Sequence, residues 1–158
     1  MTSRVIVLPS LDGAALAEFA ANLAASLSPV EVDLVGGIHH ELPEHEWIAQ
    51  VSLAISRTDN DLETIHLVAF GETTSRLPAV AFSQRAARRR VQSYVCINHI
   101  PQGQFVDWPD APVTFVKSDS LLVAEISSTA KLRGWDMMES SYDELHLAVA
   151  NAIKQYSL

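Results

Sequence analysis

The stretch Ile65-His66-Leu67-Val68-Ala69-Phe70 is almost continuously apolar, and His66 is its one polar member. Such a run is typical of a central strand in a parallel sheet, because helices cover both faces of that strand. A strand with one face in water would instead alternate apolar and polar residues. We therefore expect residues 65–70 to form the middle of a parallel sheet.

Strand-like segments also occur on both sides of this run. Val5-Ile6-Val7-Leu8 is a short apolar segment closed by Pro9, and it predicts a buried strand. Residues 30–35 alternate apolar with acidic side chains, which is the pattern of a strand near a sheet edge. Further strands are predicted at residues 91–98, 113–116 and 135–139.

Apolar residues recur at helical spacing between these strands. The predicted helices cover residues 14–27, 44–58, 77–90, 121–132 and 145–156. Pro78 is compatible with the third of them because it falls in the first turn. About six strands alternating with about five helices predict an α/β fold with three layers, a mostly parallel sheet with helices on both faces.

The composition sets limits on organisation and location. The chain has 158 residues, 48% of them hydrophobic, which is enough for one core, so we expect a single domain over residues 1–158. No apolar run approaches the roughly 20 residues of a membrane span, and no signal-peptide pattern opens the chain, so we expect a cytoplasmic protein. Cys96 is the one cysteine, and its strand-like surroundings predict a buried structural thiol.

Charge and motifs disfavour several classes of partner. A formal net charge of -8 argues against nucleic acid, because phosphate binding requires a basic face. The arginines at 85 and 88–90 are expected to interact with the negative end of a helix dipole. His39, His40 and His45 lack an established metal-ligand spacing, and no glycine-rich phosphate loop occurs, so neither a metal nor a nucleotide cofactor is expected.

Four segments resemble parts of α/β-hydrolases, and of thioesterases and esterases among them. Residues 5–13 resemble the first strand and the oxyanion loop, to which Ser10 and Leu11 would contribute. Residues 65–75 resemble the strand that leads to the nucleophile, and residues 117–121 resemble the loop with the catalytic acid. Residues 134–139 resemble the last strand, which in that family precedes the catalytic histidine. The resemblance implies a shortened α/β-hydrolase fold without the strands that usually come first and without a lid domain.

The nucleophile motif of that family is absent. The family pattern is G-x-S-x-G, because the serine occupies a strained turn between strand and helix. One alignment places Gly71 at the nucleophile position, and a second places Thr73 there with Ser75 in place of the last glycine. We favour the second, because it better preserves the spacing to Ala79, Phe82 and the next strand. Ala79, Ala81 and Phe82 match the helix that this family packs on the sheet.

The histidine of the family is also displaced. The loop after the last strand reads Ser140-Ser141-Tyr142-Asp143, and His146 follows only inside the predicted final helix. One rearranged site remains open, in which Thr73, His99 and Asp119 approach one another at the ends of three neighbouring strands. Ser75 and His146 are the alternates for the hydroxyl and the imidazole of that relay.

Three functional hypotheses follow from the sequence. The first is a non-catalytic or strongly impaired hydrolase relative, a pseudoenzyme, that binds an acyl or small apolar ligand or a protein partner. The second is an active esterase or thioesterase that uses Thr73 or Ser75 with a displaced histidine. The third is an interaction subunit that self-associates through an uncovered flank of its sheet. Trp108, in a proline-rich loop, is the expected exposed contact residue.

Overall fold

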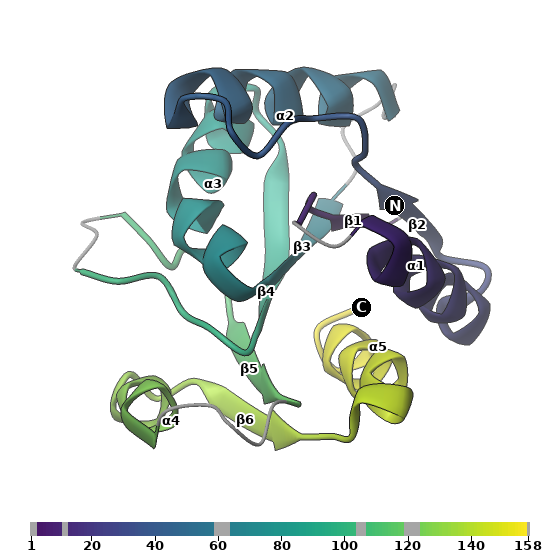
Figure 1. Ribbon diagram of the computed structural model, residues 1–158, viewed down its shortest axis with the longest axis vertical. Coiled ribbons are helices and arrows are strands. Elements are labelled where there is room, and N and C mark those ends of the chain that lie inside the picture. The colour runs from purple at the N-terminus through teal and green to yellow at the C-terminus, as the bar shows by residue number, and fades with distance from the viewer. Residues whose placement is uncertain (1–2, 11–12, 59–63, 104–106, 119–123, 158) are drawn as a thin grey trace.

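The computed structural model (Figure 1) describes residues 3–10, 13–58, 64–103, 107–118 and 124–157. Its centre is a six-stranded sheet in the order β2-β1-β3-β4-β5-β6, and every neighbouring pair of strands is parallel. The strands are β1 (Ser3–Val7), β2 (Glu31–Leu34), β3 (Thr64–Phe70), β4 (Arg90–Ile97), β5 (Val113–Lys117) and β6 (Asp136–Glu139).

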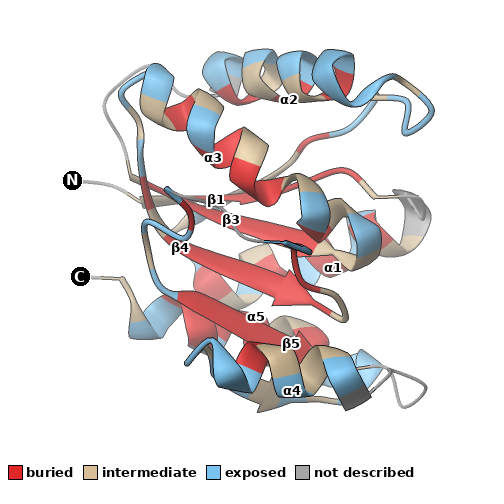
Figure 2. Ribbon diagram, turned by 90° about the vertical axis from the view of Figure 1, so that its left-hand side faces the viewer, coloured by how far each residue is buried: buried red, intermediate tan, exposed pale blue. Residues whose placement is uncertain are grey.

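Helices cover both faces of this sheet (Figures 1 and 2). One apolar core joins the sheet to α1 and α5, and the other joins it to α2, α3 and α4. The predicted three-layer α/β fold is therefore confirmed. The helices are α1 (Gly13–Leu27), α2 (Glu44–Thr58), α3 (Leu77–Ala86), α4 (Ala124–Leu132) and α5 (Leu145–Gln155), and short 3₁₀ turns form η1 (Gly71–Arg76) and η2 (Tyr142–Glu144).

Strand β3 has the central place that its sequence predicts. It pairs with β1 on one side and with β4 on the other, and residues 65–69 are completely buried. Ile65, Leu67 and Ala69 belong to the core with α2 and α3, whereas Val68 belongs to the core with α1 and α5. The continuous apolar run thus supplies both cores, since successive side chains of a strand point to opposite faces.

The strand order changes direction at β1, and this places the region where a ligand is expected. From β1 the chain crosses to β2 at one edge and then returns to β3 on the other side of β1. In open parallel sheets, the loops on the two sides of such a switch point separate at the carboxyl ends of the strands and leave a crevice. The residues that follow β1 and β3, from Leu8 and from Gly71 onward, therefore form the region in which to look for a site.

The edge strand β2 carries the acidic residues that its alternating pattern predicts. Arg4 of β1 contacts both of them: its guanidinium lies 2.7 Å from the carboxylate of Glu31 and 2.5 Å from that of Asp33. Exposed ion pairs contribute little to stability, typically about 0–1 kcal/mol. Here they fix the side chains along the edge and leave the buried face of β2 to Val32 and Leu34.

Several sequence predictions about the second half of the chain were wrong. The helix predicted to reach Arg90 ends at Ala86, because Arg88 has a φ of 63° and the chain turns there into β4. Phe82 does not pack on the sheet, and 66% of its surface is exposed. The helix predicted over residues 121–132 is present from Ala124 to Leu132, and its predicted start lies outside the described residues.

Trp108 is not an exposed contact residue. Only 6% of its surface is accessible, and its ring packs edge-on against Tyr94 and Trp135, with ring centres 5.2 and 5.8 Å away. The proline-rich loop thus folds an aromatic anchor into the core beside β4. Within the described residues, no helix has both the length and the apolar character needed to cross a membrane.

Candidate site at the carboxyl edge of the sheet

The turn after β3 is the first element of the candidate site. Phe70 is still extended, with φ -111° and ψ 139°, whereas Gly71 has a φ of 53° and opens η1. A positive φ is strained for a residue with a Cβ atom and is readily adopted by glycine. Gly71, and not Thr73, therefore occupies the sharp bend between strand and helix, and that position carries no side chain.

Thr73 lies two residues beyond the bend. It is half-buried and lines a cleft, and its hydroxyl donates a hydrogen bond to the backbone carbonyl of Pro9 at 3.2 Å. This bond joins the turn after β3 to the residues after β1. The Thr73 hydroxyl thus tethers the two loops of the switch point to each other.

The imidazole of His99 contacts the next residue, Thr74. Nδ1 of His99 lies 3.1 Å from the Thr74 hydroxyl, and Thr74 is completely buried. The hydroxyl that contacts His99 here is thus that of Thr74, whereas the relay expected from the sequence uses Thr73. Because the Thr74 side chain has no solvent access, its hydroxyl can orient His99 but cannot reach a substrate.

The third member of the predicted relay, Asp119, lies outside the described residues, as does Leu11 of the predicted oxyanion loop. The preceding residue, Ser118, is joined to the end of β4. Its backbone N–H donates to Oδ1 of Asn98 at 2.7 Å, and Nδ2 of Asn98 donates to its hydroxyl at 2.8 Å. Asn98, which has a φ of 62°, is a positioning residue that the sequence did not indicate.

The cleft itself has a volume of about 540 Å³ and runs along the carboxyl ends of β1, β3 and β4. It brings together Thr73, Ser75 and His99 from the predicted site residues, and Ser10 lies at its border. His146 does not belong to it, and lines a second pocket between α1 and α5. Ser75 and His146, the alternate hydroxyl and imidazole, therefore line different cavities.

Apolar and cationic side chains meet in this cleft. Ile38 and Phe70 supply apolar surface, and the guanidinium of Arg76 lies over the buried Trp47 ring, 4.6 Å from its centre. Stacking on an aromatic face holds a guanidinium in place while it can still donate hydrogen bonds. His40, Gln102 and the exposed carboxylate of Glu72 also line the cleft. Such a cleft suits a ligand with an apolar part and an anionic or carbonyl group.

The strongest pKa shifts lie away from the cleft. Burial lowers the pKa of His66 to about 4, and burial raises the pKa of the Cys96 thiol far above its ordinary value. A thiol of this kind is a poor nucleophile, because only the thiolate reacts readily. The sequence prediction that Cys96 is a buried structural residue is confirmed.

Comparison with known proteins gives information on the fold alone. No family model and no curated protein matches the sequence. Among solved structures, the chain is similar to the NocB thioesterase domain, whose structure is a covalent complex with a fluorophosphonate nocardicin G analog. The TM-score is 0.59 at 14% sequence identity, and the match covers 99% of this chain and 94% of that chain. The chain has the fold of a thioesterase domain.

The bend between β3 and η1 and the loop after β6 are the two remaining parts of this edge of the sheet. The residue at that bend is Gly71. After β6, the loop carries Tyr142 in η2, and His146 follows within α5. Among the described residues, the bend thus carries a glycine, and the loop after β6 contributes no histidine to the cleft.

No group of three or more histidine, cysteine, aspartate or glutamate side chains in the described part of the chain is arranged to hold a metal ion. His39 and His40 lie with their ring centres 6.3 Å apart, and His45 is exposed on α2 near Glu46. His40 is the member of this group that lines the cleft. Its role there is that of a polar side chain in a mixed binding surface.

Proposed function

We propose that this protein is a hydrolase-fold binding protein without serine-hydrolase chemistry, and that it takes a small acyl or apolar ligand in the cleft beside Gly71. The observation that carries this proposal is the glycine with φ 53° at the bend directly after β3. A residue without a side chain cannot form a covalent acyl intermediate. Without the nucleophile, the fold retains its crevice at the switch point but loses the step that uses it.

The nearby hydroxyl groups support the same proposal. The Thr73 hydroxyl donates to Pro9, and the Thr74 hydroxyl is buried against His99. Ser75 is exposed at the cleft, four residues beyond the bend. None of the three lies at the bend, where the geometry of the fold presents a nucleophile to its substrate.

The lining of the cleft indicates the ligand class. The apolar surface of Ile38 and Phe70 would take a short acyl chain, and Arg76, stacked on Trp47, would bind its carboxylate or carbonyl group. Small-molecule sites commonly combine a largely apolar wall with a few polar groups that fix orientation. A ligand of this kind needs no nucleophile for binding.

Two measurements test this proposal. Intact mass should show no adduct after incubation with a fluorophosphonate probe, and 4-nitrophenyl acetate should be hydrolysed no faster than in buffer with an equal amount of heat-denatured protein. Hexanoate, titrated into ¹⁵N-labelled protein, should shift the amide signals of Phe70, Gly71 and Arg76. Arg76→Gln should weaken this binding, whereas Arg57→Gln, at the other end of the neighbouring helix α2, should not. A stoichiometric adduct would overturn the non-catalytic proposal.

A second candidate is an esterase or thioesterase that uses Thr73 or Ser75. It is favoured by the observation that both hydroxyl residues line the same cleft as His99. In such an enzyme the hydroxyl oxygen would attack the acyl carbon while His99 took its proton, and the alcohol or thiol would leave with that proton. Water would then cleave the acyl–enzyme ester, which releases the acid and restores the hydroxyl. This candidate predicts a fluorophosphonate adduct that Thr73→Val or Ser75→Ala abolishes.

A further inference from the structure

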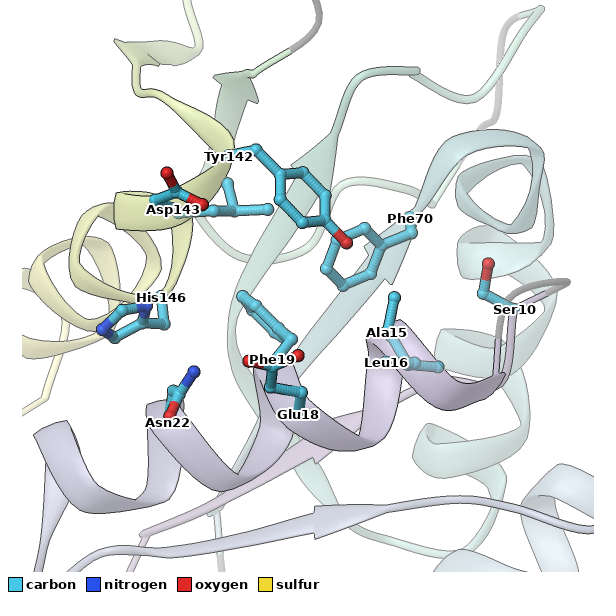
Figure 3. A pocket seen from close by; sticks show the side chains of 11 residues that line it. Ser10, Ala15, Leu16, Glu18, Phe19, Asn22, Phe70, Tyr142, Asp143 and His146 are labelled. Carbon is cyan, nitrogen blue, oxygen red and sulfur yellow. The ribbon is translucent and has the colours of Figure 1, made fainter.

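A second pocket, which we call the α1–α5 pocket, lies between α1 and the start of α5 and is lined in part by Phe70 (Figure 3). Its volume is about 350 Å³. Helix α1 forms one wall, and η2 with the start of α5 forms the opposite wall. The pocket shares Ser10 and Phe70 with the cleft, and its other lining residues are its own.

Aromatic rings form the inner surface of this pocket. Phe19 and Phe70 pack edge to face, with ring centres 4.8 Å apart and planes at 88°. Tyr142, of which 64% is exposed, directs its ring toward Phe70 in Figure 3. The faces of aromatic rings carry negative electrostatic potential, so a cation beside them is attracted.

The charged groups around the rings have the same sign. Glu18 of α1 and Asp143 of η2 stand on opposite walls of the pocket (Figure 3). The described residues that line the pocket include neither lysine nor arginine, and His146 is the one basic side chain among them. The amide of Asn22 adds a hydrogen-bond acceptor. The pocket is therefore complementary to positive charge, in contrast to the cleft with Arg76.

We propose that the α1–α5 pocket binds a small organic cation, an aryl- or alkylammonium ion. The apolar part of the cation lies against Phe19 and Phe70, and its ammonium group is directed toward Glu18 and Asp143. The proposal is independent of the ligand proposed for the cleft, because these two acidic residues do not line the cleft.

The decisive experiment compares three probes of nearly equal size and different charge. The 2-phenylethylammonium ion, neutral 2-phenylethanol and the phenylacetate anion are titrated into ¹⁵N-labelled protein, and amide shifts are mapped. The ammonium ion should bind about fivefold more tightly than the alcohol, with shifts at Phe19, Leu145 and His146. The anion should not bind in this pocket. Equal affinity for the ammonium ion and the alcohol would overturn the proposal.

Substitutions separate the pocket from a general attraction of cations to an acidic protein. Glu18→Gln and Asp143→Asn should each weaken ammonium binding about threefold and leave 2-phenylethanol binding unchanged. Glu125→Gln removes the same charge from α4, on the other face of the sheet, and should have no effect. Tyr142→Leu should weaken the binding of both probes. Equal effects of Glu18→Gln and Glu125→Gln, or shifts centred on Gly71, would contradict a cation site between α1 and α5.

Discussion

Nδ1 of His66 lies 2.6 Å from the hydroxyl of Ser93 in the interior of the protein, where both side chains are almost completely inaccessible. On its other side, Nε2 of His66 lies 3.3 Å from the hydroxyl of Ser157. Ser157 donates its own proton to the carbonyl of Ile153 at 2.8 Å, so it accepts from Nε2–H, and Ser93 donates to Nδ1. The imidazole is thus satisfied in its neutral form and connects β3 to the residues after α5.

The first prediction concerns pH. Burial lowers the pKa of His66 to about 4 from 6.5, so below pH 6.5 the unfolded chain takes up a proton that the folded protein does not. The contribution of His66 to the free energy of unfolding should be constant above about pH 6.5 and should fall as the pH is lowered toward about 4. The total loss should be about 3 kcal/mol. Urea denaturation between pH 7.5 and pH 4 measures this.

The variant His66→Gln provides the control for this pH dependence. It keeps polar contacts toward Ser93 and Ser157 but cannot titrate, so its stability should depend less on pH than that of the parent protein. Titration of the acidic residues is common to the two proteins and cancels in the comparison. Parallel curves for the two proteins over this pH range would show that His66 is not the cause.

The second prediction concerns the bend. Gly71→Ala should destabilise the fold by about 1–2 kcal/mol, because alanine is strained at a φ of 53° although no atom lies within 4 Å of the added Cβ. Gly36→Ala is the matched control, since that site is equally open and does not have a positive φ. Its stability should equal or exceed that of the parent. Chemical denaturation that ranks the two variants in the reverse order would refute the assignment of the strained position.

The third prediction distinguishes the two threonines of η1. Thr74→Val removes the buried partner of His99 and should cost about 1 kcal/mol, and it should shift the imidazole nitrogen signals of His99 in NMR spectra. Thr73→Val should leave those signals in place, because its hydroxyl contacts Pro9. Ser75→Ala, at an exposed position, should change stability by less than about 0.5 kcal/mol. A His99 response to Thr73→Val alone would restore the relay first expected from the sequence.

The fourth prediction concerns the proline-rich loop. Trp108→Ala should destabilise the protein by about 3–5 kcal/mol, because the buried indole packs between Tyr94 and Trp135. Leu132→Ala removes a large apolar side chain that is 88% exposed, and it should change stability by less than about 0.5 kcal/mol. Thermal unfolding of the two variants, monitored by circular dichroism, tests this prediction. Similar melting temperatures for Trp108→Ala and the parent would mean that the loop does not anchor the core.

These results indicate what the sequence can predict in this fold. The strand at residues 65–70 was correctly placed at the centre because burial on two faces leaves a continuous apolar signal. The helix α2 was correctly oriented because Trp47, Val51 and Ile55 repeat with the period of a helix. The apolar run of β3 and the helical repeat of α2 are both local patterns. Each pattern is set by the face or faces that the element itself buries.

The turn at residues 71–76 could not be predicted in the same way. It is a 3₁₀ turn and not the first turn of an α-helix. A 3₁₀ helix rotates by about 120° per residue and an α-helix by about 100°. The two conformations therefore differ by about 60° in the direction of the side chain three residues beyond Gly71. That difference decides whether Thr73 or Thr74 meets His99. The burial of Trp108 likewise depends on contacts with Tyr94 and Trp135, which are distant in sequence. The sequence of the loop itself therefore does not predict that Trp108 is buried.

Both borders of the sheet are only four residues long, and each carries two acidic residues, Glu31 and Asp33 on β2 and Asp136 and Glu139 on β6. Another strand that tried to extend the sheet from either side would find a short template, and a second copy of this chain would bring its own carboxylates toward those already there. Short acidic edges of this kind are among the features that give natural sheets protection against edge-to-edge pairing. Acidic conditions, which neutralise these carboxylates, would remove that protection.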